Sequence, residues 1–424
     1  MKTYFSNPYN TEEVLTDGGL KVLNRMTGLS YKFESAAANI YRYIKEHAQC
    51  SIQEVCVQFE EFTAEDIENI VHYFHRKRII LTENTADLAC ITKKDTPLFG
   101  LSDHLKKEGL AFLGIPFGAG NPLPNSCANF PDYLRVQLRS QHLSFKQSFF
   151  QSNSISRAHF DYQEEHNLNR LAQQYVCDLG NIFLHFSENK QLIYERIELL
   201  SRQLANQAIP FFVGGDHSIT YNLVKGVASI HSPLCFVQLD AHSDTYRSNY
   251  DRLTHLSSSH HHGNFVNRCL ELEGVNRVLQ LGLRGQSNFS LGHIHPKQRL
   301  ISCRVLKAMI QRGCLHFDLP SEGKLYISID IDVLDPSIAS ATTTPEKEGL
   351  NLEELLIILR YFMDHYGDRI VGFDLVEVSA HLDTDKMTTK SVTEILIQII
   401  QRFCSQKDKE NERAISTLQE VSTR

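Results

Sequence analysis

Short β and helical periods of hydrophobic residues dominate the start of the chain. Apolar runs at residues 20–24 and 29–33 flank a turn that contains Gly28, which predicts a β-hairpin. Three helical patterns with capping residues at their starts follow, and apolar residues 79–81 end the segment as a strand. The order of hairpin, three helices and strand predicts a small winged-helix-like α+β domain over residues 1–85.

An α/β pattern replaces this one in the rest of the chain. Residues 86–108 show no strong period, and we expect a linker there. The strand-like apolar runs that follow are residues 111–115, 209–213, 234–239, 278–283, 325–331 and 370–378. Helical stretches such as residues 190–205 lie between several of them. This alternation predicts a three-layer α/β/α domain with a mostly parallel sheet over residues 109–404, followed by a polar tail at 405–424.

Composition and charge exclude several classes of protein. The 43 Lys and Arg residues against 50 Asp and Glu leave a net charge of −7, so no basic field favours nucleic acid or an anionic membrane. The N-terminus lacks the apolar core of a secretory signal, and no apolar run approaches the roughly 20 residues that span a bilayer. We expect a cytoplasmic protein that forms a homo-oligomer and binds neither nucleic acid nor membranes.

Ionisable residues follow four of the predicted strands. The four clusters are Gly214-Gly215-Asp216-His217, Asp240-Ala241-His242-Ser243-Asp244, Asp330-Ile331-Asp332 and Val376-Glu377. In an open parallel sheet, ligands bind beyond the carboxyl ends of the strands. We therefore expect all four clusters to converge on one edge of the sheet.

Most of the clustered residues are of types that bind metal ions. Residues two apart along a strand face the same way, so the members of the second cluster can share one site, as can those of the third. The six candidate ligands are His217, Asp240, His242, Asp244, Asp330 and Asp332. Carboxylates with imidazole and no thiolate favour Mn²⁺ or a similar ion over structural zinc. Six ligands exceed the needs of one open site, so we expect two ions, about 3.5–4 Å apart, that activate water.

Each motif alone has a simpler interpretation. A DxHxD segment is common at solvated strand ends, and a GGDH segment is common in tight turns with a capping Asp. Their joint placement at the ends of separate apolar strands favours the metal site, because so many acidic groups at one edge would repel one another without a cation.

The three motifs resemble the signatures of a known enzyme family. GGDHS, DAHSD and SIDIDVLDPSIA resemble those of the ureohydrolases, which are arginases, agmatinases and guanidino-acid hydrolases. The resemblance covers roughly residues 109–404. It implies an arginase-like fold with two manganese ions that hydrolyses a guanidinium carbon to urea and an amine. It further implies that the six candidate ligands bind manganese, with Asp240 and Asp330 as bridging carboxylates.

Two further positions match the family. The segment from Gly372 to Glu377 resembles the strand whose Glu pairs with the substrate guanidinium, a role that suits a bidentate carboxylate. The alternative is a buried Glu in a salt bridge at a strand end. His262 followed by Gly resembles the family His that passes a proton to the leaving amine. His260 and His261 are its neighbours, so the choice among the three stays open, as does a solvated loop of His without a catalytic role.

Departures from the family bear on the substrate. Arginases for free arginine hold its α-amino and α-carboxylate groups through polar residues near the second signature and an Asp after a strand end. Tyr246 stands here where a small amide is usual, and Gly285 stands where that Asp would be. A site without those partners loses much of its discrimination for the zwitterion. Both residues are closer to the agmatinase pattern, and Tyr246 is a candidate substrate-binding residue. The threonines at 342–344 replace the usual Thr-Gly-Thr.

The N-terminal segment resembles the winged-helix peptide-recognition modules of ribosomal-peptide modification pathways. Such modules bind a leader peptide by strand addition between hairpin and helix. A DNA-binding winged helix would be basic, whereas residues 1–90 hold nine Lys and Arg against 13 Asp and Glu. An oligomerisation or lid domain is the remaining alternative.

Together these features predict a manganese ureohydrolase that converts arginine side chains of a leader-containing precursor peptide to ornithine. An agmatinase-like or guanidino-acid hydrolase that acts on a small molecule is the alternative within the class. A non-enzymatic peptide-binding protein on a retired hydrolase scaffold is the alternative of another class. The complete set of six candidate ligands argues against it.

Overall fold

The structure is a computed structural model of the 424-residue chain. It describes residues 3–7, 10–24, 29–47, 49–77, 79–82, 91–92, 94–121, 123, 126–139, 162–184, 188–246, 260–285 and 294–422. The predicted turn with Gly28 and residues 86–90 of the predicted linker lie outside the described residues.

The chain divides into two compact units. The first comprises Met1–Thr92 with Phe183–Arg196, and the second comprises Lys93–Ile182 with Ile197–Arg424. The predicted domain limits at residues 85, 108 and 404 stay predictions.

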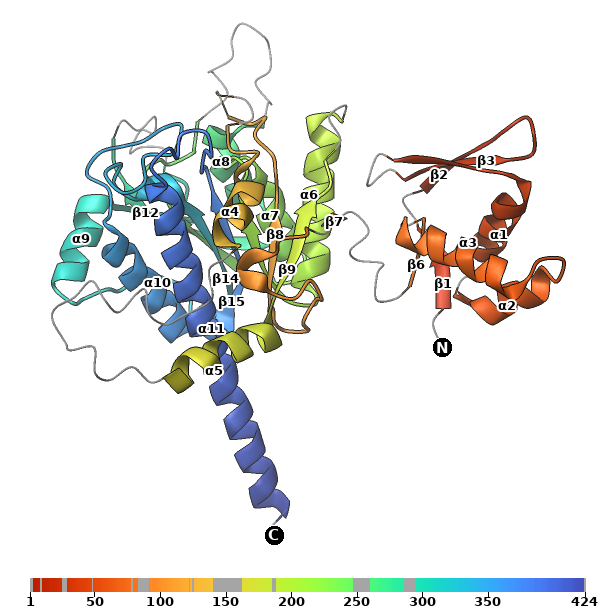
Figure 1. The fold of residues 1–424 in the computed structure, drawn as a ribbon. Coiled ribbons are helices and arrows are strands. Elements are labelled where there is room, and N and C mark those ends of the chain that lie inside the picture. Colours follow the sequence, from red (N-terminus) through yellow and green to blue (C-terminus); the bar gives the residue numbers. More distant parts are fainter. Residues whose placement is uncertain are drawn as a thin grey trace, which may run out of the picture. The chain divides into compact units, whose positions relative to one another are not determined.

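Two small antiparallel sheets and three helices make up most of the described part of Met1–Thr92 (Figure 1), and the segment Phe183–Arg196 adds the start of one further helix. Its elements are β1 (Thr3–Ser6), β2 (Asn10–Val14), β3 (Leu20–Asn24), β4 (Ser30–Phe33), α1 (Ser35–Glu46), β5 (Cys50–Ser51), α2 (Ile52–Gln58), α3 (Ala64–Arg76), β6 (Ile80–Leu81) and β7 (Ile91–Thr92). One sheet has the order β2-β3-β4 and the other β5-β1-β6. Strands β3 and β4 pair antiparallel as the hairpin prediction requires, with Val22 opposite Tyr31.

Capping residues and one apolar core hold the first unit together. Ser51 and Glu54 form a reciprocal capping box at the start of α2, and Thr63 caps α3. Phe33 of β4 lies against Phe74 of α3 with the ring centroids 4.8 Å apart, so the sheet β2-β3-β4 and α3 share a core. The resemblance of this unit to peptide-recognition modules stays a prediction.

In the part of the second unit that the structure describes, eight strands pair in parallel. Their order is β13-β12-β11-β14-β15-β10-β8-β9. The bounds are β8 (Leu110–Gly114), β9 (Val176–Ile182), β10 (Ile209–Val213), β11 (Leu234–Leu239), β12 (Val275–Leu283), β13 (Gln298–Ser302), β14 (Lys324–Asp330) and β15 (Ile370–Val376). Most of these strand residues are buried.

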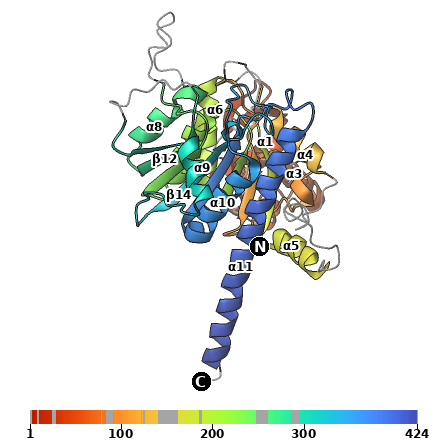
Figure 2. The ribbon, with the colours of Figure 1, turned by 90° about the vertical axis from the view of Figure 1, so that its left-hand side faces the viewer.

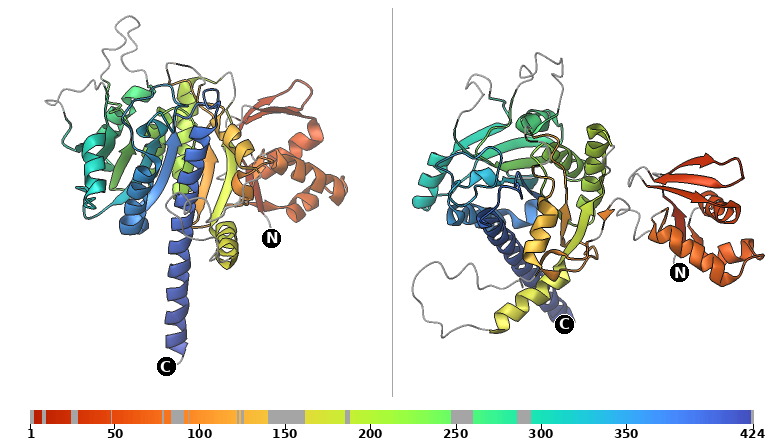
Figure 3. Two further views of the ribbon diagram at one scale, coloured as in Figure 1. Left: turned by 60° about the vertical axis from the view of Figure 1, so that its left-hand side comes forward. Right: turned by 45° about the horizontal axis from the view of Figure 1, so that its top comes forward.

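Helices cover both faces of this sheet (Figures 1, 2 and 3). The helices are α4 (Phe130–Leu138), α5 (Tyr162–Tyr175), α6 (Lys190–Ala205), α7 (Ile219–Ala228), α8 (Phe265–Glu271), α9 (Cys303–Gln311), α10 (Leu352–Tyr366) and α11 (Met387–Ser422), with short 3-10 turns η2 (Leu98–Gly100), η4 (His262–Asn264), η6 (Ile331–Val333) and η7 (Gly367–Arg369). The arrangement confirms the predicted three-layer α/β/α class with a mostly parallel sheet.

The residues of β11 alternate between the two faces of the sheet. Cys235, Val237 and Leu239 of β11 belong to the large apolar core that also includes α10 and α11. The alternate residues of β11 point to the other face, where the ring centroids of Phe236 and of Phe265 in α8 are 6.1 Å apart. That second face also carries the buried Gln238.

Two strands and the end of the chain differ from the pattern. Strands β9 and β13 were not among the predicted runs, since each contains polar residues. In β9, Asp178 is buried because Arg135 donates to both of its carboxylate oxygens at 2.7 Å. Helix α11 continues through residue 404 to Ser422, so the backbone of the predicted polar tail is helical there. Among the described residues, no helix is long and apolar enough to cross a membrane.

Candidate metal centre

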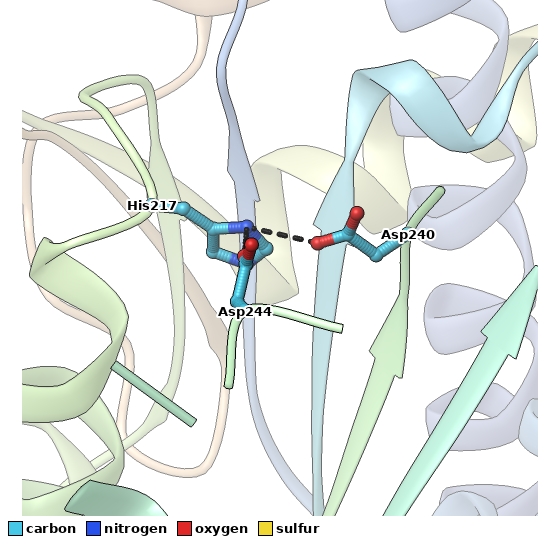
Figure 4. A group of neighbouring side chains, drawn as sticks. All are labelled: His217, Asp240 and Asp244. Carbon is cyan, nitrogen blue, oxygen red and sulfur yellow. Dashed lines mark ion pairs between the residues drawn. The ribbon is translucent and has the colours of Figure 1, made fainter. Parts of the chain in front are cut away.

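Four adjacent strands of the sheet carry the candidate site. Strands β11, β14, β15 and β10 are neighbours in that order, and each is followed at its carboxyl end by one of the ionisable clusters. The clusters meet at one edge, as expected for parallel strands. Figure 4 shows His217, Asp240 and Asp244 pointing toward one another there.

Turns, rather than strand alternation, bring the acidic residues together. Strand β11 ends at Leu239, so Asp240 and Asp244 lie in the loop beyond it. The N–H group of His242 donates to Asp240 Oδ1, and Asp244 has a φ of +48°, which curls the segment back. Asp240 and Asp244 thus lie close together as predicted. The reason differs from the predicted one, because both residues lie beyond the end of β11, where the alternation of a strand no longer applies.

The loop after β10 divides the roles of its two polar residues. Asp216 accepts hydrogen bonds from the N–H groups of Ser218 at 3.0 Å and Gly120 at 2.7 Å, so this residue is the capping Asp of a turn. His217 is instead fully buried and turned into the acidic cluster. The Asp of the GGDH motif thus makes the turn contacts that the simpler interpretation requires, whereas its His faces the acidic residues.

One group of candidate ligands surrounds His217. Its Nδ1 atom lies 3.1 Å from Asp240 Oδ2, 3.2 Å from Asp244 Oδ2 and 3.0 Å from Asp330 Oδ2. Despite these short distances, Nδ1 has no partner in hydrogen-bonding geometry among the described residues. The nitrogen and the three carboxylate oxygens thus converge, so a cation bound by these oxygens would be within reach of Nδ1.

A second group surrounds His242. Its Nδ1 atom lies 2.9 Å from Asp332 Oδ2 and 3.6 Å from Asp240 Oδ1. Asp332 lies in η6, where its N–H group donates to Asp330 Oδ1 at 2.9 Å. The ligand atoms of Asp240, His242 and Asp332 lie within 4.8 Å of one another, as do those of His217, Asp240 and Asp244. Asp240 belongs to both groups, with one oxygen directed to each.

The pKa values of the clustered residues are shifted in a way that favours bound cations. Burial and the charge of Asp240 raise the pKa of Asp244 to about 6. Burial, with the charges of Asp332 and Asp240, also raises the pKa of Asp330 well above its ordinary value. Burial alone would lower the pKa of His242, but its contacts with Asp240 and Asp332 outweigh burial and raise it to about 12. The carboxylates thus need positive charge beside them, and oxygen donors with two imidazoles fit a pair of divalent ions.

A buried hydrogen-bond relay holds the far side of the His217 ring. His217 Nε2 lies 3.0 Å from Ser328 Oγ, which in turn donates to Asp374 Oδ1 at 2.5 Å. Tyr326 and Thr220 donate to the other oxygen of Asp374 at 2.9 and 3.0 Å. Imidazoles that bind metal commonly donate their second N–H to such a partner, which orients the ring.

Sequence reasoning missed this relay. Ser328 precedes the Asp330-Ile-Asp332 motif, and Asp374 precedes Glu377, in both cases on an apolar strand. A carboxylate in the middle of a buried strand was the available signal, because such a group needs several donors.

Glu377 is buried and held from several sides. Its Oε1 atom accepts the N–H group of His217 at 2.8 Å, and its Oε2 atom accepts Asn121 Nδ2 at 2.7 Å and the thiol of Cys127 at 3.5 Å. Burial alone would raise the pKa of Glu377, but His262 and the His217 N–H outweigh burial and lower it. Glu377 also has a φ of +64°, an unfavourable conformation for a residue with a side chain. Asn121 gave no motif signal and was missed.

The three adjacent His residues differ in their surroundings. His262 begins η4, and its Nδ1 atom lies 3.4 Å from Glu377 Oε1. The side chain of His261 accepts the N–H group of Gly263 and caps η4, while His260 Nε2 contacts the carbonyl of Ser218. The geometry therefore favours His262 for the predicted proton transfer, although that role stays a prediction.

The two positions linked to the substrate lie in different surroundings, Tyr246 beside η4 and Gly285 beside Glu346. The N–H group of Tyr246 donates to the carbonyl of Gly263 at 3.0 Å, which holds its backbone beside η4. Its substrate-binding role stays a prediction. Gly285 has a φ of +66°, and a Cβ atom at this position would lie 2.5–2.7 Å from the carboxyl group of Glu346. Glu346 Oε1 also lies 3.8 Å from His242 Nε2, so a carboxylate from another loop covers this glycine.

Comparisons with known proteins agree with this geometry. The pattern of the arginase family matches residues 109–401. Mitochondrial guanidino acid hydrolase of Homo sapiens is 31% identical over 238 residues, which are 53% of this chain and 63% of that protein, so less than two thirds of its length is spanned. Mitochondrial agmatinase of Gallus gallus is 29% identical over 307 residues, 69% of this chain and 81% of that protein.

A solved structure supports the fold. Proclavaminate amidinohydrolase from Streptomyces clavuligerus superimposes with a TM-score of 0.57 and 24% sequence identity, over 74% of this chain and 98% of that one. This likeness confirms the predicted arginase-like fold of the second unit.

Proposed function

Since this chain belongs to the arginase family, we propose that it hydrolyses the guanidino group of its substrate to urea and an amine. The observation that carries the proposal is the pair of ligand groups that share Asp240, next to the buried carboxylate of Glu377. The residues that would hold two manganese ions are His217, Asp240, His242, Asp244, Asp330 and Asp332. Asp240 and Asp330 would bridge them.

The chemistry of the bound ions and of the protein is distinct. Divalent cations bound here would lower the pKa of a bound water, so that it could serve as the nucleophile near neutral pH. Glu377 binds the guanidinium. Oε1 also lies 3.4 Å from His262 Nδ1, and Oε2 also accepts the Cys127 thiol at 3.5 Å, so a planar cation that pairs with both oxygens would replace these two longer contacts.

His262 would move the proton that the leaving amine needs. Burial alone would lower the pKa of His262, but its contact with Glu377 outweighs burial and raises it. The raised pKa favours the protonated imidazole beside the carboxylate of Glu377, from where a ring nitrogen would donate the proton.

The reaction is tested by urea release. The full chain supplied with MnCl₂ is incubated with agmatine, free arginine, 4-guanidinobutyrate and an arginine-containing peptide, and urea is measured. Release from at least one of them, abolished by a chelator and restored by Mn²⁺, is expected. No release from any of them would contradict the proposal and revive the non-enzymatic alternative.

We further propose that the substrate is an arginine side chain in a peptide, which becomes ornithine. Tyr246 supports this choice, since its side chain is not the small amide that arginases for free arginine have at this position. At Gly285 the nearest carboxylate comes from Glu346 of another loop and not from the residue itself. The first unit also supports it. Strand β4 lies at the edge of its sheet and packs against α3, an arrangement suited to strand addition by a leader peptide.

Peptide delivery predicts a dependence on the leader segment. With the full chain, kcat/KM for urea release is expected to be higher for a precursor peptide with its leader than for the same peptide without it. Equal values for the two peptides would contradict delivery by the first unit. Faster turnover of agmatine or 4-guanidinobutyrate than of either peptide would instead favour the small-molecule hydrolase.

A further inference from the structure

Three buried glutamines form a line across adjacent strands of the second unit. Gln298 lies on the edge strand β13, Gln280 on β12 and Gln238 on β11, where Gln238 and Gln280 face each other in the register. Gln298 Nε2 donates to Gln280 Oε1 at 2.5 Å, and Gln280 Nε2 donates to Gln238 Oε1 at 2.6 Å. The line therefore runs from the outermost strand, β13, to β11, whose carboxyl end leads into the cluster that begins at Asp240.

The inner end of this line reaches two candidate metal ligands. Gln238 Nε2 donates to Asp240 Oδ2 at 2.5 Å and lies 3.4 Å from Asp244 Oδ2. Asp240 Oδ2 is also the oxygen that lies 3.1 Å from His217 Nδ1. The amide of Gln238 thus bonds to the same carboxylate oxygen that faces the His217 group.

Backbone groups give the line one direction. A carboxamide can be turned so that its oxygen and nitrogen exchange places, which would point an acceptor at Asp240. The N–H group of His295 donates to Gln298 Oε1 at 3.3 Å, and an N–H group cannot act as an acceptor. The carbonyl of Ser243 accepts Gln280 Nε2 at 2.7 Å, and a carbonyl cannot donate. The His295 contact fixes Gln298 at the outer end and the Ser243 contact fixes Gln280 in the middle, so every amide presents its nitrogen toward the candidate site.

We infer that Gln280 and Gln298 are positioning residues, which keep the Gln238 amide turned with its N–H toward Asp240. The inference rests on the proposed metal centre. An oriented donor fixes the rotation of the Asp240 carboxylate, so that one oxygen faces each ligand group. Loss of the oriented donor leaves a buried polar atom unsatisfied, and partners of this kind commonly change metal affinity by about 10–100-fold.

The test is a direct measurement of Mn²⁺ binding to the full chain. Gln280→Leu removes the donor to Gln238 and the acceptor of Gln298 at similar volume. Titration followed by electron paramagnetic resonance should show that this variant binds at least one of the two ions about tenfold more weakly than the wild type. Gln298→Leu, one step further from the site, should weaken binding by a smaller factor.

Gln401→Leu is the matched control. Gln401 is a buried glutamine of α11, and its Nε2 atom has no hydrogen-bond partner among the described residues. The control should bind both ions with wild-type affinity, even where its metal-free melting temperature falls as much as that of Gln280→Leu. A general loss of stability would move the melting temperatures alone and would leave the Mn²⁺ titrations unchanged.

The outcomes separate the two proposals. Wild-type binding of two ions, with unchanged affinity in both Gln280→Leu and Gln298→Leu, would overturn the positioning role and leave the metal centre intact. Failure of the wild type to bind Mn²⁺ would overturn the metal centre on which the inference rests. Should Gln280→Leu not fold, the Gln298→Leu titration decides the question by itself.

Discussion

The two candidate metal-binding imidazoles have the same chemistry but different supports. His217 is fully buried, and its Nε2 atom, which points away from the candidate ligands, contacts Ser328. Ser328 in turn donates to Asp374 on the neighbouring strand. The side chain of His242 is 24% exposed, and its outer nitrogen faces Glu346, which is 33% exposed. One ring is thus held from within the sheet, and the other is held from a loop at the solvent side.

We call the ligands around His217 the His217 half of the site and those around His242 the His242 half. The different supports indicate that the His217 half is the more rigid one. Asp374 accepts three hydrogen bonds from residues in elements of the core, so His217 turns only if several buried groups move. Glu346 depends on its loop, which Arg284 ties down by donating to the carbonyls of Glu346 and Lys347 at 3.0 Å. We therefore expect the His217 half to retain metal most firmly and the His242 half to tolerate change.

The largest effect is expected where the two halves meet. Asp240→Ala removes the carboxylate that both groups share, so urea formation should fall by at least about a thousandfold and fewer than two Mn²⁺ should bind per chain. Asp318→Ala is the control, because Asp318 is a carboxylate 67% exposed beside Arg277 and Arg299. Two tightly bound ions in Asp240→Ala would show that the halves are independent.

The second-largest effect is expected for a change in the buried relay of Ser328 and Asp374 behind His217. Asp374→Asn replaces an acceptor of three hydrogen bonds by an amide, whose nitrogen must face a donor. Mn²⁺ affinity should fall by about 10–100-fold in a calorimetric titration. Asp383→Asn provides the comparison, because Asp383 is a buried carboxylate that accepts the N–H groups of Thr388 and Thr389 at the start of α11. Equal losses of affinity in both variants would indicate a general effect of buried charge.

Asn121 should affect the substrate and leave the metal unaffected. Asn121→Ala removes the donor to Glu377 Oε2, and a hydrogen bond to a charged group contributes about 1.5–3 kcal/mol. KM for the guanidino substrate should rise about tenfold or more, while Mn²⁺ affinity stays at the wild-type value. A fall in Mn²⁺ affinity without a change in KM would place Asn121 with the metal ligands.

The smallest effect is expected at the solvent side. Glu346→Gln keeps the shape of the side chain and weakens its contact with His242, which is already 3.8 Å long and partly exposed to water. Mn²⁺ affinity should fall by only a few-fold, well below the effect of Asp374→Asn. A larger loss for Glu346→Gln would reverse the ranking of the two halves.

Short motifs made much of the candidate site accessible from the sequence. The residues that face the cluster lie within a few positions of a strand end, and runs such as Asp240 to Asp244 keep their chemistry together along the chain. The supporting residues were out of reach, since Asn121 and Glu377 are 256 positions apart. Likewise, the buried polar strand β9 depends on Arg135, which lies on another element.

The hydrophobic periods were enough to predict the α/β/α class and the side of the sheet, at the carboxyl ends of its strands, where the candidate site lies. Parallel strands place their carboxyl ends on the same side of a sheet in any strand order. Strand order, the turn that curls Asp244 back, and the relays behind His217 and Asp240 came only from the tertiary structure. These features depend on hydrogen bonds between strands that are distant in sequence, and no local pattern of residues encodes which strands become neighbours.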